Sequence, residues 1–107
     1  IEIALKKEAI NFDKKIKQND VVILLSENGK NYSTTELLGK FNHWVDKNQR
    51  VVYILGSAYG LHQSLYTSNR ATLSLSKLTF THEMALVIFY EQLYRLTTLR
   101  IGKRYHY

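Results

Sequence analysis

The 107-residue sequence contains no cysteine and no proline, and it has only five glycines. Without cysteine the chain has no disulfide framework and no thiolate metal site, which is compatible with the cytoplasmic location that we expect. The four histidines are far apart and lack the spacing of metal ligands, so no metal site is predicted. No apolar run approaches the roughly 20 residues of a membrane-spanning helix, and no membrane association is expected.

Motifs of several common enzyme classes are also absent. No Gly-rich dinucleotide fingerprint and no P-loop occurs, and no nucleophile-elbow motif marks a serine hydrolase. Glu83 and Glu91 lie eight residues apart on one predicted helix, but nothing marks them as a catalytic pair. The residues by themselves therefore do not name a reaction.

The positive charge is concentrated at the end of the sequence. The net charge is +6, and the last thirteen residues contain four cations and no acidic residue: Arg95, Arg100, Lys103 and Arg104. Combined with the terminal segment Tyr105-His106-Tyr107, these cations could bind phosphates and stack on bases. The alternative interpretation is a solvated chain end without a binding role.

Hydrophobic patterns predict strands that alternate with helices. Leu5, Ala9, Phe12 and Ile16 recur at helical spacing at the start of the chain. Short aliphatic runs predict buried strands at three places, residues 21–25, 51–55 and about 72–75. This alternation indicates an α/β fold with a parallel sheet flanked by helices.

Capping residues also predict where the other helices start. Ser33 and Glu36 have the spacing of a capping box, which predicts a helix from there onwards. A short helix is expected near His62 to Ser68, and Thr81 can cap a long final helix.

The strand ends are the predicted ligand site, because open parallel sheets bind ligands beyond the carboxyl ends of their strands. Those ends fall near Leu25, Leu55 and Leu75, so three separate segments meet at one edge. Gly56 has no Cβ and allows close backbone approach there. In the connection that follows the third strand, Leu78 and Phe80 are too apolar for an ordinary surface loop.

Several motifs fall in register with one known family. They are SKLTF at 76–80, His82, EQLYR at 91–95, Gly102, Tyr105-His106, and GLH at 60–62 after ILGS at 54–57. Together they resemble the RlmH family of SPOUT-superfamily methyltransferases, which act on N3 of a pseudouridine in 23S ribosomal RNA. The resemblance covers nearly all of the chain.

The resemblance implies S-adenosylmethionine as methyl donor, with no metal. It also implies a trefoil knot near the C-terminus, in which the loop after the third strand wraps the donor. Leu78 and Phe80 would then be covered, and Gly56 would make room for the donor. The donor-binding positions carried over from the family are Leu25, Gly56, Leu75, Ser76, Lys77, Leu78, Thr79 and Phe80. Plain core packing is the alternative for the apolar members of this set.

The family match also implies three substrate-facing residues. Arg95 would stabilise negative charge that develops on the uracil ring. Tyr105 and His106 would position the base or relay its N3 proton. A helix-end cation favoured by the helix dipole is the alternative for Arg95.

The family pattern implies a homodimer, with the final helix and the knot at its interface, that acts on the large subunit or the 70S ribosome. We expect residues 1–107 to be a single SPOUT domain that lacks the N-terminal strand and helix of family members. The family has arginine at the position of Leu86 and proline at that of Thr81. The missing N-terminal portion and Leu86 leave open an alternative, a non-catalytic RNA-binding or dimerisation remnant of the same fold.

Overall fold

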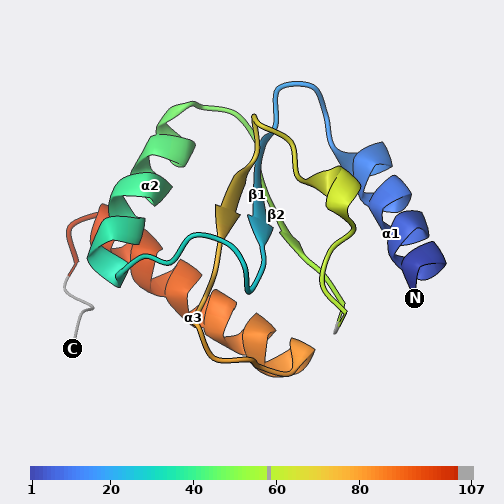
Figure 1. The fold of residues 1–107 in the computed structure, drawn as a ribbon. Coiled ribbons are helices and arrows are strands. Elements are labelled where there is room, and N and C mark those ends of the chain that lie inside the picture. The colour runs from blue at the N-terminus through green and yellow to red at the C-terminus, as the bar shows by residue number, and fades with distance from the viewer. Residues whose placement is uncertain (58, 104–107) are drawn as a thin grey trace.

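Three parallel strands form the centre of the computed structural model, which describes residues 1–57 and 59–103 (Figure 1). The strands are β1 (Val21–Leu25), β2 (Val51–Leu55) and β3 (Ala71–Leu73), in the spatial order β2-β1-β3. The other elements are the helices α1 (Glu2–Lys15), α2 (Thr34–Asp46) and α3 (His82–Arg100) and the 3-10 turn η1 (Gln63–Leu65). The predicted α/β class with a parallel sheet is therefore confirmed.

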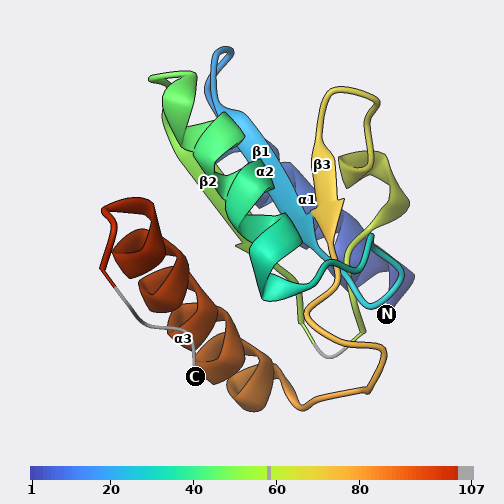
Figure 2. The ribbon, with the colours of Figure 1, turned by 90° about the vertical axis from the view of Figure 1, so that its left-hand side faces the viewer.

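The sheet separates two layers of helices. Helices α2 and α3 lie on one side of the strands, whereas α1 and η1 lie on the other (Figures 1 and 2). Within β1, Ile23 and Leu25 pack in the cluster with α2 and α3, and Val22 and Leu24 pack in the cluster with α1 and η1. Because successive strand residues point to opposite faces, β1 has to be apolar throughout.

Side-chain caps fix the starts of α2 and α3. The Ser33 hydroxyl accepts a hydrogen bond from Glu36 N at 3.1 Å, and Ser33 N donates to Glu36 Oε1 at 2.8 Å. The hydrogen bond from Ser33 N holds the pKa of the Glu36 carboxyl below its usual value, and the Ser33 side chain adds to this effect. Thr81 Oγ1 accepts from Met84 N at 3.3 Å. Both predicted caps are thus confirmed, and they supply the helix boundaries in a chain that has no proline.

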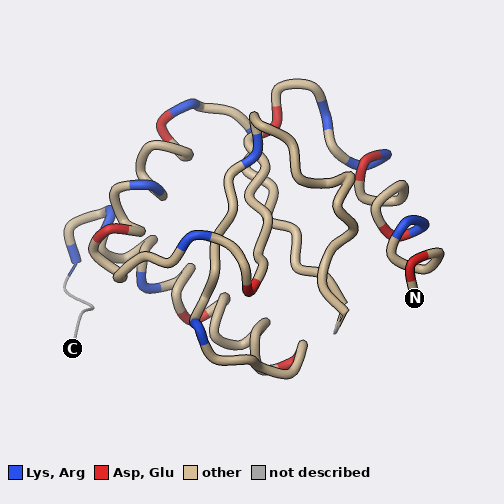
Figure 3. The backbone as a smooth tube through the Cα atoms, viewed as in Figure 1, with Lys and Arg blue, Asp and Glu red and all other residues tan. Residues whose placement is uncertain are grey.

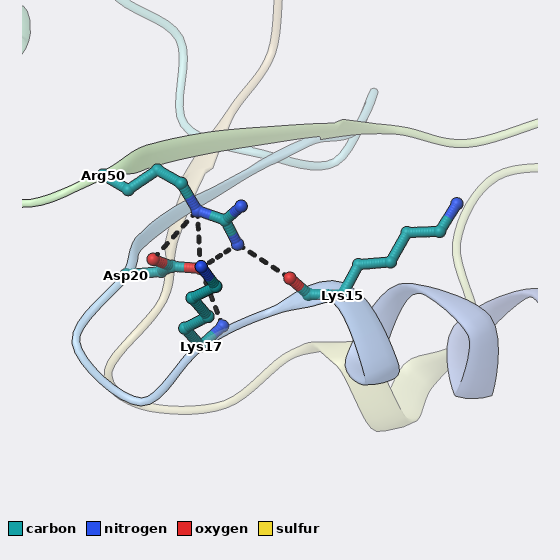
Figure 4. A network of polar contacts seen from close by, with 4 residues as sticks. All are labelled: Lys15, Lys17, Asp20 and Arg50. Carbon is teal, nitrogen blue, oxygen red and sulfur yellow. Dashed lines mark hydrogen bonds and ion pairs between the residues drawn. The ribbon is translucent and has the colours of Figure 1, made fainter.

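One arginine ties the end of α1 to the starts of β1 and β2 (Figure 4). Arg50 Nε donates to both carboxylate oxygens of Asp20 at 3.1 Å. Arg50 Nη2 donates to Lys15 O at 2.7 Å, which satisfies a carbonyl at the end of the helix. The nearby guanidinium holds the pKa of Asp20 below its usual range, and a hydrogen bond from Lys17 N adds to this effect.

Two local predictions are wrong in detail. The third strand spans Ala71–Leu73 rather than residues 72–75, because the chain leaves the sheet at Ser74, whose N–H donates to Lys30 O at 2.9 Å. Leu75 then packs against the cluster of α2 and α3. The helix expected near His62 to Ser68 is only the 3-10 turn η1.

Charged residues lie on the helices and connecting loops (Figure 3), and the three strands contain none. In the part of the chain that the structure describes, no helix is both long and apolar enough to cross a bilayer.

Candidate functional site

A pocket of about 320 Å³ lies at the carboxyl edge of the sheet. Its walls come from the connections after β1, β2 and β3 and from the first turn of α3. These loops leave the sheet at the same edge because all three strands run parallel (Figure 1). The volume is in the range of pockets that hold small molecules.

Six of the eight residues that the family resemblance implies for donor binding line this pocket: Leu25, Gly56, Leu75, Ser76, Leu78 and Phe80. Lys77 and Thr79 belong to the same loop but not to the pocket lining. The structure adds His82 and the tyrosines Tyr59 and Tyr66. No spacing pattern marks these three, because they meet the pocket only through the tertiary fold.

Leu78 departs from the prediction that the loop after β3 is covered. Its side chain is 70% exposed, whereas Phe80 is partly buried. Local hydrogen bonds shape this loop: Leu78 N donates to Ser76 Oγ at 2.9 Å, and Ser74 Oγ donates to Ser76 O at 2.8 Å. The prediction of a covered Leu78 is therefore wrong for the single chain, although the side chain does border the pocket.

The loop after β2 leaves no space for a side chain at Gly56. A Cβ at this position would lie 2.5 Å from Gly60 O and 2.8 Å from Leu61 Cδ2. Gly60, at a φ of +86°, folds the loop back, and its N–H donates to Ser57 O at 2.9 Å. The expectation that Gly56 makes room for a ligand needs correction, because the space is taken by the Gly60 carbonyl.

A side chain from α3 holds the same loop. His82 is the first residue of α3, and its Nδ1 lies 2.8 Å from Gly56 O. A carbonyl oxygen only accepts, so Nδ1 is the donor in this bond. The bond joins two walls of the pocket that are 26 residues apart in the sequence.

Arg95 does not lie at the pocket of its own chain. It follows His82 by thirteen residues on α3, which is about 20 Å along a helix axis. Its Nη2 donates to Glu91 Oε2 at 3.2 Å, one helical turn away. The other predicted substrate-facing residues, Tyr105 and His106, lie outside the described residues.

The basic end of the chain is partly neutralised by contacts with α2. Arg100 Nη2 donates to Asp46 Oδ1 at 2.7 Å, and Arg100 Nη1 donates to Asn42 Oδ1 at 2.9 Å. Arg95 is likewise paired with Glu91. Two of the four cations counted in the sequence therefore have acidic partners, which weakens the case for a purely electrostatic phosphate site.

Residues 1–57 and 59–103 bring together no group of His, Asp and Glu side chains that could hold a metal ion. The pocket lies beyond the carboxyl ends of the parallel strands, where open α/β sheets bind small molecules.

Comparison with known proteins specifies the class further. The family model described as "Predicted SPOUT methyltransferase" matches residues 1–106, and the chain belongs to this family. The family predicted from the sequence motifs is thus confirmed, and with it the class of enzyme.

Curated relatives agree with this assignment. Several bacterial proteins named ribosomal RNA large subunit methyltransferase H are similar to this chain. The one from Pseudothermotoga lettingae is 36% identical over 104 residues, covering 97% of this chain and 68% of the relative. The Bacteroides fragilis protein is 38% identical over 107 residues, with 95% and 66% covered. That of Dictyoglomus thermophilum is 36% identical, with 99% and 70% covered. The chain thus spans about two thirds of the length of these relatives.

Proposed function

We propose that this chain transfers a methyl group from S-adenosylmethionine to N3 of a pseudouridine in 23S ribosomal RNA of the large subunit. One observation carries the proposal. In a chain that belongs to a methyltransferase family, six of the eight expected donor-binding residues line one pocket at the strand ends.

The pocket suits a donor of this kind. Its volume of about 320 Å³ is that of a small-molecule site, and its walls combine polar and apolar residues, most of them from three loops. Such walls can hydrogen-bond an adenine through main-chain groups and cover its faces. The trefoil knot belongs to the proposal, since threading would hold the loop after β3 against the donor. Donor or a second chain would cover the exposed Leu78.

Methyl transfer to N3 places two requirements on the protein. When bound, S-adenosylmethionine supplies an electrophilic methyl group, so the chain has to hold that group in line with N3 of the base. It also has to accommodate the N3 proton as the new bond forms. Arg95 is proposed to stabilise charge on the base, and Tyr105 and His106 to orient it or relay its proton.

The position of Arg95 makes this mechanism depend on two chains. About 20 Å of helix separates it from the pocket of its own chain. A homodimer in which the end of α3 approaches the partner's pocket would bring the donor and the substrate-facing residues together.

The surface of α3 supports such a dimer. Four large apolar side chains are exposed: Val87, Tyr90 and Tyr94 on the helix, and Ile101 directly after it. Their spacings of three, four and seven residues place them on one side of the helix. Phe89 and Leu93, in contrast, pack against the core. Water-exposed apolar stripes of this kind mark interaction surfaces.

The decisive experiment is methyl transfer from radiolabelled donor to ribosomes that lack the modification. We expect incorporation into 23S RNA at a pseudouridine, with reversed-phase analysis of the digested RNA assigning the methyl to N3. A chain that binds ribosomes but neither binds the donor nor transfers methyl would instead be the non-catalytic remnant.

The dimer is tested separately. Val87→Glu and Tyr94→Glu each place a charge within the apolar stripe and should shift sedimentation from dimer to monomer, with loss of methyl transfer. Lys40→Glu, an exposed change on α2, is the matched control and should leave the dimer intact. A wild-type chain that sediments as a monomer at micromolar concentration would exclude the dimer.

A further inference from the structure

The bond between His82 and Gly56 connects two walls of the pocket that differ in local structure. Gly56 begins the tightly folded loop after β2, and His82 begins the long helix α3. Both residues line the pocket. The bond length of 2.8 Å between Nδ1 and the carbonyl oxygen is that of a well-formed hydrogen bond.

This bond orients a complete peptide group. The peptide between Gly56 and Ser57 is planar, so fixing its carbonyl oxygen towards His82 also fixes the direction of the Ser57 N–H. Gly56 lacks a side chain that could restrict this peptide by itself. The orientation of the backbone at this wall of the pocket is therefore set by the contact from α3 together with the bridge between Ser57 and Gly60.

The ring itself is held by its helix. Thr81 caps α3 through Met84 N, which sets the position of His82 as the first helical residue. Ala85, one turn later on the same side, also lines the pocket. The first turn of α3 is therefore both a wall of the site and the support of the histidine.

We propose that His82 is a positioning residue of the donor site: its Nδ1–H fixes the Gly56–Ser57 peptide in the orientation that the donor requires. This inference rests on the proposed function, because it assigns the pocket to the methyl donor. It makes donor binding depend on the docking of α3 against the end of β2. His82 acts through the backbone and has no role in proton transfer.

Amide side chains test which ring nitrogen matters. Asparagine carries its N–H at the position of Nδ1, whereas glutamine carries it near that of Nε2. We expect His82→Ala to weaken the binding of S-adenosylmethionine about fivefold in calorimetry, as for one lost hydrogen bond. His82→Asn should restore most of this loss, and His82→Gln should not. In methyl-transfer assays the Ala variant should show a raised KM for the donor and a nearly unchanged kcat.

Glu83→Ala is the control for a general weakening of the helix start. Glu83 lies next to His82 in the first turn of α3 but is not part of the pocket lining. We expect a lower melting temperature for this variant with unchanged donor affinity. If His82 only stabilised the fold, His82→Ala would likewise lower the melting temperature and leave donor affinity unchanged.

Three results would overturn the inference: wild-type donor affinity in a folded His82→Ala variant, rescue by Gln but not Asn, or a fall in kcat alone. The two amide variants keep a polar side chain, so their comparison decides the question where the Ala variant fails to fold. If the wild-type chain binds no donor, the proposed function fails as well. If the wild type binds and transfers methyl while His82→Ala behaves identically, only the role of His82 is wrong.

Discussion

His62 Nε2 lies 2.8 Å from Glu2 Oε1 and so joins the first turn of α1 to η1. On its other side, His62 Nδ1 accepts a hydrogen bond from Ser64 N at 3.1 Å. Because Nδ1 accepts, the neutral ring carries its proton on Nε2 and donates it to Glu2. A histidine from the loop that lines the pocket therefore anchors α1, which lies with η1 on one side of the sheet.

The two partners should contribute very differently to stability. The Glu2 side chain is 73% exposed, whereas His62 is 8% exposed. Glu2→Ala should lower the free energy of unfolding by less than about 1 kcal/mol, as for surface pairs. His62→Ala also removes the cap of η1 and leaves a gap, so a loss of roughly 2 kcal/mol is expected. Urea denaturation measures both, and equal losses would contradict this assignment.

Gly56 and Gly39 offer a matched pair of glycine substitutions. Gly56→Ala would push a Cβ to 2.5 Å from Gly60 O, so the loop must shift, and donor affinity should fall at least about tenfold. Gly39 lies in α2 with nothing within 4 Å of an added Cβ. Gly39→Ala should therefore stabilise the fold by about 0.5–1 kcal/mol with unchanged donor binding. Calorimetry and thermal unfolding report the two effects.

Asp20 should make the protein sensitive to acid. Its folded-state pKa is lowered by Arg50, so its contribution to stability is complete above the pKa of the unfolded state. That contribution is lost as the pH falls through the lower folded-state pKa. Asp20→Asn should therefore unfold at lower urea concentration than wild type at pH 7, and the difference should narrow towards pH 2. A constant difference across this range would contradict the linkage.

Tyr53 should act at the opposite end of the pH scale. Burial raises the pKa of this phenol to about 12. The centroid of its ring lies 4.9 Å from that of the Phe89 ring and 6.4 Å from that of the Trp44 ring. The stabilisation it gives is complete below pH 10 and is lost as the pH rises towards 12. Replacement by phenylalanine should lessen the loss of stability in this interval. Unfolding curves measured from pH 9 to pH 12 provide the check.

The elements that the sequence predicts well are those encoded by neighbouring residues. The aliphatic runs of β1 and β2 and the Ser33–Glu36 capping box each signal their structure within five residues. The end of β3 is different, because Leu75 is apolar whether it continues the strand or packs against α2 and α3. Its placement is decided by the contact of Ser74 with Lys30, far away in the sequence.

Some features of the candidate site could likewise be predicted from the sequence, and others could not. The sequence predicts the location of the pocket, because parallel strands must end together, and family motifs supply six of its lining residues. The contact of His82 with Gly56 has no local signature. The exposure of Leu78 and the distance of Arg95 from the pocket are likewise properties of the folded chain, which a linear motif does not contain.

The parallel arrangement of the strands has a practical consequence. The turns that enter the strands, residues 17–20, 47–50 and 67–70, lie at the opposite end of the sheet from the pocket (Figure 1). A dye attached to a cysteine introduced at Asn69 or Gln49 would be the sole thiol label in this chain, since no native cysteine competes. Binding to ribosomes, the proposed partner, could thus be followed by fluorescence from a label at the end of the sheet opposite the pocket.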